Sequence, residues 1–468
     1  MPDERFEEHL LHPRGRGHEP AGGHSASAGG SLCGDLVRLT LAVRGDRVAD
    51  AGFEAEGCGA TIAAASAAVE LAADRMVTDV ARVDSAAVAA ELGGLSAGKL
   101  HAADLAADAL ARALGTAVYR DGGVSPVAGR TLVAMSGGVD SAVAALFAAR
   151  AGEAVAVTLE LWRDEHNDAE RSCCSASAVR TARTLAQGMG LPHFTLDLRE
   201  EFRAGVVDPW LAGHAAGLTP NPCVACNGEV RLDAMLDLAE RVGAETLATG
   251  HYARIGDDGL LRAAADPAKD QTYMLAGLGA ESLRRLRFPL GELTKPQVRE
   301  LAEREGLPVA RKPDSQDLCF LAGTGQAAFL ARHGGMAPQA GPVVDAQGDA
   351  IGSHDGAHAY TVGQRRGLGV GGTAEPLYVI ATDVVANTVT VGSREALQTD
   401  RVRVVGLRLH AGADQVDAVK LRYRSKALPC TLRGTEIELH EPGWAAAPGQ
   451  TAVFLRGDRV LGSATISA

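Results

Sequence analysis

The chain has 468 residues, of which 46% are hydrophobic and 22% are charged, and its formal net charge is -12 at pH 7. This composition excludes disordered and fibrous chains, and no apolar run reaches the roughly 20 residues of a membrane-spanning helix. We therefore expect a cytoplasmic protein of about three domains with no membrane partner. The 8 cysteines are expected to be reduced thiols that serve catalysis or metal binding.

The front of the chain predicts a small α+β module over residues 1–122. Its first 30 residues or so are rich in Gly, His, Ser and Ala, which predicts a mobile arm. Alternating patterns and helical composition follow, and a Gly- and Pro-containing linker ends the module. The predicted elements are strands over 36–43 and 48–55 and helices over 60–73 and 100–114.

Metal-ligating side chains gather in this module. Cys33 and Asp35 lie in one loop, Cys58 lies in a second loop, and His101 stands at the start of a predicted helix. A thiolate, a carboxylate and an imidazole are ligands that suit zinc or an iron–sulfur cluster. The alternative is a module that has lost its metal and retains only the fold, as a docking domain.

Residues 131–141 predict a phosphate-binding turn. The apolar run that ends at Met135 is typical of a buried parallel strand, and helical composition resumes at Ser141. The two glycines between them let the backbone approach a ligand, and the new helix directs its free N–H groups into the turn. No Gly-Lys-Ser/Thr follows, so this is not a Walker A loop. Asp140 stands where a carboxylate can meet Mg²⁺. The motif resembles the pyrophosphate loop (PP-loop) of adenylating enzymes, which implies ATP as a ligand.

Strands and helices then alternate, which predicts an α/β domain with a parallel sheet over residues 130–333. Ligands of such sheets bind beyond the carboxyl ends of the strands, so Ser136, Leu161 and Gly250-His251 are expected around an adenosine. The predicted elements are strands over 154–159, 193–197 and 245–249 and helices over 176–188 and 232–242.

Three groups of cysteines fall in this domain. Cys223 and Cys226 form a Cys-x-x-Cys in a proline-rich loop, and Cys319 follows Asp-Ser-Gln-Asp-Leu. A thiolate is a good nucleophile near neutral pH, so these cysteines are candidates for catalysis or metal binding. Cys173 and Cys174 are interpreted as small residues near a helix start, and Cys430 as a core residue.

Beyond residue 330 the composition becomes β-like. We expect a small central domain over 334–398 and a β-barrel over 399–468. The Gly-Gln-Arg-Arg-Gly turn and the Arg-Tyr-Arg run are either solvated surface charge or phosphate clamps with a stacking aromatic, as RNA binding requires. Acidic residues are concentrated in residues 1–122, whereas basic residues outnumber acidic ones in residues 400–468.

Seven motifs in order resemble those of the tRNA-specific 2-thiouridylase family (MnmA), a family of PP-loop ATPases, over about residues 130 to 468. They are Ser-Gly-Gly-Val-Asp-Ser, Asn-Pro-x-x-x-Cys-Asn, Thr-Gly-His-Tyr, Lys-Asp-Gln-x-Tyr, Asp-Ser-Gln-Asp-x-Cys-Phe, Tyr-Thr-Val-Gly-Gln-Arg-x-Gly-Leu and Arg-Tyr-Arg. Cys-Gly-Asp, Gly-Cys-Gly and Lys-Leu-His similarly resemble the IscU/NifU-N iron–sulfur scaffold family over about residues 5 to 118. Ala102 stands where the third scaffold cysteine is expected.

The resemblance implies that ATP adenylates the C2 oxygen of the wobble uridine of tRNA, with Cys319 carrying a persulfide and Cys226 as its partner nucleophile. A cysteine desulfurase or a sulfur relay protein is the implied sulfur donor. The implied ATP-binding residues are Ala134, Met135, Ser136, Gly137, Gly138, Val139, Asp140, Ser141, Leu161 and Gly250. The implied tRNA-binding residues are Asn221, Pro222, Cys223, His251, Lys269, Asp270, Gln271, Arg422, Tyr423 and Gln450.

Several alternatives stay open. Cys223, Cys226 and Cys319 equally suit a [4Fe–4S] cluster whose open iron carries the sulfur. The front module binds zinc through Cys33, Asp35, Cys58 and His101, or a cluster, or no metal. A PP-loop ligase that makes a small amide needs neither Cys226 nor Cys319, and an iron–sulfur carrier is disfavoured by Ala102.

Overall fold

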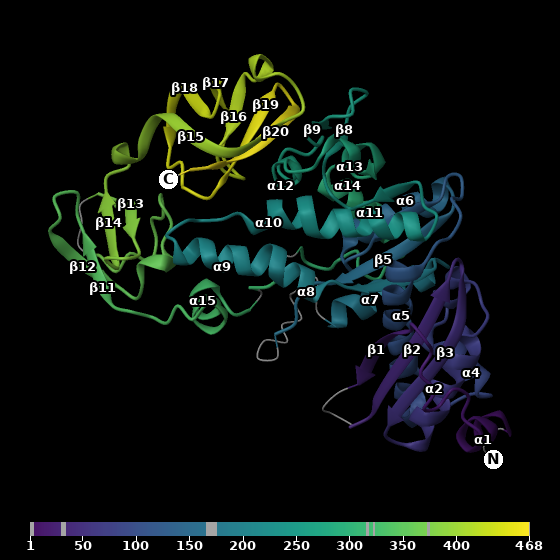
Figure 1. Cartoon of the computed structure of the whole chain (residues 1–468). Coiled ribbons are helices and arrows are strands. Elements are labelled where there is room, and N and C mark those ends of the chain that lie inside the picture. Colours follow the sequence, from purple (N-terminus) through teal and green to yellow (C-terminus); the bar gives the residue numbers. More distant parts are fainter. Residues whose placement is uncertain are drawn as a thin grey trace.

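The protein is described by a computed structural model that covers residues 4–29, 34–164, 176–314, 318–321, 323–371 and 375–467. Figure 1 shows the front module in purple and blue at one end of the molecule, and the C-terminal barrel in yellow at the other. No helix within these ranges is long and apolar enough to cross a membrane. Cys33, Cys173 and Cys174 lie outside the described residues.

The front module is α+β, as predicted. Three antiparallel strands form its sheet in the order β1-β2-β3, and alanine-rich helices pack on it. The strands are β1 (His24–Gly29), β2 (Leu36–Arg44) and β3 (Arg47–Glu56). The helices are α1 (Glu4–Leu11), α2 (Gly59–Ala72), α3 (Val77–Val80), α4 (Ser85–Glu91), the short 3₁₀ helix η1 (Ala97–Lys99) and α5 (Leu100–Asp121).

The prediction of a mobile arm over the first 30 residues is wrong for the described part of that segment. α1 packs on α2, with Phe6 and Leu10 against the module core and a 2.9 Å hydrogen bond joining His9 Nδ1 to Ser66 Oγ. β1 pairs along β2 from His24 to Gly29. The small, polar composition concealed this order because the segment is held by its neighbours rather than by its own propensity.

The central unit is the predicted parallel sheet, in the order β10-β7-β4-β5-β6. Its chain order reverses between β4 and β7, which makes the carboxyl ends of these two strands the topological switch point. The strands are β4 (Thr131–Ala134), β5 (Ala154–Glu160), β6 (His193–Asp197), β7 (Thr246–Ala248) and β10 (Leu286–Arg287). The ligand site predicted at Ser136 and Gly250 therefore follows the two strands that flank the switch point.

Helices cover both faces of this sheet, and the segments around the cysteines include two π-helical turns, η2 and η3. Such turns are rare and are frequently found at functional sites. The helices are α6 (Val139–Ala151), α7 (Ala176–Gly188), α8 (Arg199–Phe202), η2 (Arg203–Val207), α9 (Asp208–Ala215), α10 (Pro222–Ala225), η3 (Cys226–Arg231), α11 (Leu232–Arg241), α12 (Thr272–Leu275), α13 (Ala280–Arg285), α14 (Lys295–Arg304) and α15 (Gln326–Gly334).

Two β units end the chain. A four-stranded sheet, β12-β11-β14-β13, forms the central domain, and a pairing of β15 with β20 closes β15-β18-β17-β16-β19-β20 into the predicted barrel. The hairpin β8–β9, which follows β7 of the parallel-sheet unit in the chain, extends the barrel sheet at β20. The strands are β8 (Arg254–Ile255), β9 (Leu261–Arg262), β11 (Gly341–Val344), β12 (Ala350–His354), β13 (Tyr378–Asp383), β14 (Thr388–Gly392), β15 (Gln398–Leu409), β16 (Ala418–Lys420), β17 (Leu428–Arg433), β18 (Glu436–Trp444), β19 (Thr451–Arg456) and β20 (Arg459–Ile466). Short 3₁₀ helices connect them: η4 (Ala357–Ala359), η5 (Glu395–Leu397) and η6 (Ala413–Gln415).

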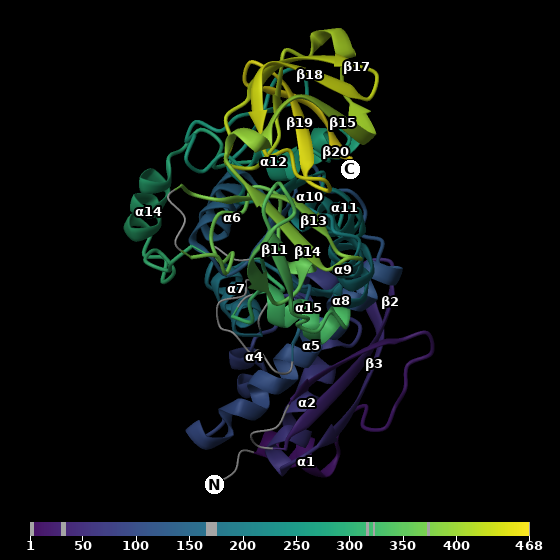
Figure 2. The ribbon, with the colours of Figure 1, turned by 90° about the vertical axis from the view of Figure 1, so that its left-hand side faces the viewer.

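The front module is docked rather than loosely tethered. Helix α5 packs on edge strand β6, and Gly115 lies so close that an added Cβ would meet the Thr195 carbonyl oxygen at 1.9 Å. Figure 2 shows the front module below the parallel-sheet unit, with α5 on the side that faces this unit. The predicted linker is also fixed, because Gly123 N donates to Gly45 O and Val124 N to Arg241 O. The segment that the composition predicts as a linker is therefore held by hydrogen bonds to both units.

Candidate functional site

The turn after β4 has the geometry of a phosphate cradle. Gly137 adopts a φ of +69°, and a Cβ there would meet the Ala178 carbonyl oxygen at 2.7 Å. Gly250, which follows β7, lies against the start of α6, since its added Cβ would be 2.8 Å from the Asp140 carbonyl carbon. Ser141 Oγ accepts from Ser136 N at 3.1 Å and so closes the turn. The predicted Ser136–Ser141 loop and Gly250 are thus brought together, and buried Leu161 follows the neighbouring strand β5.

Asp140, the predicted magnesium ligand, has protein partners in this structure. Lys295 Nζ lies 2.7 and 2.8 Å from its two carboxylate oxygens, and Tyr252 OH donates to one of them at 2.9 Å. A second cation, Lys312 Nζ, donates to the Gly137 carbonyl at 3.0 Å. Neither lysine belongs to a residue set predicted from the sequence, because no local motif marks them.

These groups fit a polyphosphate ligand. The amino-terminal N–H groups of α6 and two ammonium groups favour a tetra-anion, and the glycines leave room for its close approach. The Asp140 side chain is 31% exposed, and its carboxylate pairs with Lys295. This carboxylate is the group that would coordinate the magnesium ion of a bound MgATP.

A charge network extends from this loop, through Lys295, to Asp314. The Asp314 carboxylate accepts from Lys269 Nζ at 2.7 Å and Arg299 Nη2 at 2.9 Å, and it lies 2.8 Å from Lys295 Nζ. Burial alone would raise the pKa of Asp314, but hydrogen bonds from Lys269 and Lys295 outweigh it and hold the pKa at about 2. Asp314 precedes Cys319 by five residues in the sequence.

The predicted nucleophiles lie in packed surroundings. Cys226 is buried at the first residue of η3, one turn after the half-buried Cys223 in α10. Cys319 is half-buried, and the next residue, Phe320, is inserted among aromatic rings. The ring centroids of Phe320 lie 6.0 Å from Phe202, 5.3 Å from Trp210 and 5.1 Å from Phe329.

This aromatic group anchors the segment that carries Cys319. Phe202 directly precedes η2, and η2 packs against η3, whose first residue is Cys226. The segment with Cys319 therefore packs, through Phe320, on Phe202, and the segment with Cys226 packs on the adjoining helical turn η2. Cys430, predicted as a core residue, is buried in the barrel, and burial raises the pKa of its thiol to about 11.

The residues predicted to contact tRNA make several bonds within the protein. Gln450 Nε2 donates to the Thr219 carbonyl at 2.7 Å, and Arg422 donates to the carbonyls of Val362 and Ala445. These bonds join the barrel to the segment before Cys223 and to the central domain.

Other members of that predicted set are also held in place. The side-chain Oδ1 of Asn221 caps α10 by accepting from Cys223 N at 3.1 Å, and Pro222 starts that helix. Burial lowers the pKa of His251 to about 3. Lys269 donates to Asp314, and Asp270 accepts from the Thr272 hydroxyl. The side chain of Gln271 accepts from Tyr252 N. The ring centroid of Tyr423 lies 5.9 Å from that of Tyr273.

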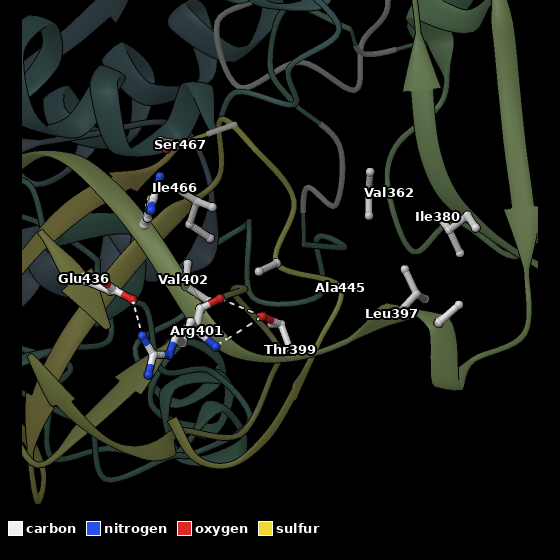
Figure 3. A pocket seen from close by; sticks show the side chains of 13 residues that line it. Val362, Ile380, Leu397, Thr399, Arg401, Val402, Glu436, Ala445, Ile466 and Ser467 are labelled. Carbon is white, nitrogen blue, oxygen red and sulfur yellow. Dashed lines mark hydrogen bonds and ion pairs between the residues drawn. The ribbon is translucent and has the colours of Figure 1, made fainter. Parts of the chain in front are cut away.

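A cavity of about 520 Å³ lies between the central domain and the barrel. Figure 3 shows Val362 and Ile380 on one side and Val402 and Ile466 on the other, with Arg401 paired to Glu436 at 3.2 Å. None of the described residues that line it belongs to the predicted ATP or tRNA sets. The cavity therefore lies at the interface between the two β units and is not the predicted ATP or tRNA site.

Three of the four metal ligands predicted in the front module, Asp35, Cys58 and His101, lie close together. His101 Nε2 lies 3.2 Å and Cys58 Sγ 3.8 Å from Asp35 Oδ2, and the three ligand atoms lie within 4.8 Å of one another. A hydrogen bond from Thr61 lowers the pKa of Asp35, which keeps the carboxylate ionised. Sulfur, nitrogen and oxygen donors in this arrangement fit zinc. Ala102, in place of a third cysteine, is fully buried in α5, so the donor set is poorer in thiolate than a cluster scaffold requires.

Replacing His101 by alanine is expected to weaken zinc binding by roughly 100-fold, because one of the few protein ligands is lost. Its Nδ1 faces the Gly98 carbonyl at 3.0 Å, which leaves the Nε2 lone pair for the metal. Competition with a chromophoric chelator measures the affinity. His18→Ala is the matched control, because His18 forms a similar pair with Asp50 in the same module. Equal zinc affinity in the two variants would contradict the assignment.

Comparisons with known proteins cover the whole chain. Family models match for a NifU-like N terminal domain, a tRNA methyl transferase HUP domain, a tRNA methyl transferase PRC-barrel domain and an aminomethyltransferase beta-barrel domain, at residues 3–121, 129–323, 327–393 and 400–466. A "Bifunctional protein NifU/MnmA" from Rubrobacter xylanophilus is 43% identical over 99% of this chain and 98% of its own length.

Shorter relatives match the part behind the front module. The "tRNA-specific 2-thiouridylase MnmA" of Salinispora tropica is 47% identical over 72% of this chain and 99% of its own length. The protein of the same name from Thermus thermophilus is 44% identical over 72% of this chain and 94% of its own. The chain therefore belongs to the MnmA family of tRNA-specific 2-thiouridylases, which are tRNA sulfurtransferases, and it carries a NifU-like module in front of the thiouridylase domains.

Proposed function

We propose that this protein uses ATP to activate the C2 oxygen of the wobble uridine of tRNA and replaces that oxygen by sulfur. The observation that carries the proposal is the charge network around Asp314. It joins Asp140 of the phosphate loop, through Lys295, to Asp314, which lies five residues before Cys319 in the sequence. This network supports an adenylating site that acts together with a sulfur-carrying cysteine nearby in the sequence.

In the proposed reaction the C2 oxygen attacks the α-phosphorus of ATP, and pyrophosphate leaves with the electron pair of the broken P–O bond. The terminal sulfur of a persulfide on Cys319 then attacks C2, and AMP departs. The Cys226 thiolate attacks the Cys319 sulfur of the adduct, which breaks the S–S bond and leaves 2-thiouridine and a Cys226–Cys319 disulfide. An external thiol reduces this disulfide for the next cycle.

Cys223 supports a second route for the sulfur. It lies one turn before Cys226, and Cys319 belongs to a later segment, so the chain offers three thiols as candidate ligands. This donor set fits a [4Fe–4S] cluster with one iron free to carry sulfur. In either route Cys226 and Cys319 are required, whereas Cys223 is essential only in the second.

The front module is proposed to hold zinc through Asp35, Cys58 and His101, with Cys33 as the fourth ligand, and to bind a cysteine desulfurase or a sulfur relay protein. The ligand geometry supports zinc, and the buried Ala102 argues against cluster assembly. The docking of α5 on β6 supports a fixed rather than a tethered delivery of the donor.

The test is to purify the full chain without oxygen, record its absorption spectrum and incubate it with unmodified tRNA, MgATP, cysteine and a cysteine desulfurase. We expect 2-thiouridine by nucleoside mass spectrometry, together with stoichiometric AMP. Omitting ATP is the control. AMP release without any thionucleoside, or no dependence on ATP, would contradict the proposed function.

A further inference from the structure

One buried ammonium group lies between the phosphate loop and the Asp314 network. Lys295 is only 7% exposed, and its Nζ contacts both oxygens of Asp140 and one oxygen of Asp314, at 2.7 to 2.8 Å. Its backbone is fixed as the first residue of α14, where Thr294 and Gln297 form a capping box and Lys295 N donates to Asp266 Oδ2 at 3.0 Å. The ammonium therefore has a defined position beside the turn.

Stability alone does not explain this arrangement. A buried ion pair contributes little net stability, because the loss of hydration offsets the attraction between the charges, and apolar residues often replace such pairs without loss. Here the pair instead includes Asp140, in the second position of the helix that opens at the phosphate loop. The Asp140 side chain is 31% exposed and that of Lys295 is 9% exposed. The carboxylate is therefore accessible to a solute, whereas the ammonium is buried.

We propose that Lys295 is a phosphate-binding residue of the ATP site, a role that rests on the proposed adenylation. Without nucleotide, its ammonium compensates the charge of Asp140. When MgATP binds, the carboxylate of Asp140 is needed for the metal ion, and the ammonium donates its hydrogen bonds to phosphate oxygens instead. As the bond between the α-phosphorus and the bridging oxygen breaks, the electron pair passes to pyrophosphate, and the nearby positive charge stabilises it.

Asp314 makes this exchange feasible. It keeps Lys269 Nζ at 2.7 Å and Arg299 Nη2 at 2.9 Å as partners when Lys295 moves towards a phosphate. Asp140 likewise retains the Tyr252 hydroxyl at 2.9 Å. Neither carboxylate is then left buried without a hydrogen bond, so the lysine can change partners at low cost.

The experiment compares Lys295→Gln with wild type and with Arg311→Met as the matched control. Glutamine keeps a donor for Asp140 but removes the charge, whereas Arg311 is 90% exposed and pairs with Glu303 of α14. Calorimetry with a non-hydrolysable MgATP analogue is expected to show a Kd about tenfold higher for Lys295→Gln, and AMP formation with tRNA is expected to fall roughly 100-fold. The control should match wild type in both.

Affinity for tRNA, measured by filter binding, reports whether Lys295→Gln is folded, and Lys295→Met provides a second charge-free variant. Wild-type analogue affinity and AMP formation in either folded variant would overturn the inference. A failure of the proposed function is distinguishable, because wild type itself would then form no 2-thiouridine. A folded variant with weakened analogue binding and slow AMP formation supports the role of Lys295.

Discussion

Replacing Cys319 by serine is expected to abolish 2-thiouridine formation, with a loss of at least about 1,000-fold, while ATP-dependent AMP formation stays within a few-fold of wild type. A hydroxyl carries no transferable sulfur and is not ionised near neutral pH. Asp140 of the phosphate loop pairs with Lys295, which also pairs with Asp314. Adenylation depends on such phosphate-binding groups and not on a thiol, so it should not need this sulfur. Mass spectrometry of tRNA nucleosides and an AMP assay on the same samples measure the two steps separately.

Cys430→Ala is the control for this experiment, because Cys430 is buried in the barrel between β-strand neighbours and belongs to neither cysteine segment. It should thiolate tRNA at a rate close to that of wild type. Retained thiolation in Cys319→Ser would contradict both proposed routes for the sulfur.

Cys223→Ser then distinguishes the two routes. If a persulfide carries the sulfur, this variant should retain thiolation and show no change in its absorption spectrum. If a cluster carries it, the variant should lose both its brown colour and its thiolation after anaerobic reconstitution. Iron and labile sulfide, counted per chain, check the interpretation.

The parallel sheet was predictable from the sequence because its signals are local. The apolar run that ends in β4, the Gly137–Gly138 turn and the breaker-free α6 each follow from a few adjacent residues, and the positions of β5, β6 and β7 agree with the predicted strands. The convergence of Asp35, Cys58 and His101 was predicted from ligand chemistry and from the resemblance to a scaffold family.

The features that the sequence analysis missed depend on contacts between distant residues. Lys295 is unremarkable at the start of an amphipathic helix until the fold places it against Asp140 and Asp314. The first strand, β1, has little strand propensity of its own and is held by pairing with β2. No local pattern indicates that α5 docks on β6, because the small residues on its packed face also suit the core of an isolated module.

The interface between α5 of the front module and the parallel-sheet unit contains a network of largely buried ion pairs. Across it, Arg112 of α5 pairs with Glu160 at the end of β5 and, at 3.1 Å, with Asp108, which in turn pairs with Arg183 of α7 at 2.6 Å. The side chains of Glu160 and Arg183 are 9% and 10% exposed. Burial raises the pKa of Glu160, and the nearby Arg112 opposes this increase. The interface therefore depends on compensated charges.

Arg112→Met is expected to destabilise the docked state by about 3–5 kcal/mol, because Glu160 loses its partner while it remains buried. Arg120→Met is the matched control on the same helix. Arg120 pairs with Glu201 across the same interface at 3.5 Å, but both side chains are about half exposed, so its loss should cost at most about 1 kcal/mol. Thermal unfolding and hydrogen exchange of α5 amides measure the difference.

The loss should depend on pH in a defined direction. Without Arg112, the folded-state pKa of Glu160 rises further above its unfolded value, so the folded variant binds more protons than the unfolded chain. Its stability relative to wild type should therefore be better at pH 5 and worse at pH 8, whereas Arg120→Met should show no such trend. Equal losses in the two variants, or a pH trend of opposite sign, would show that Glu160 is not held by Arg112 across the interface.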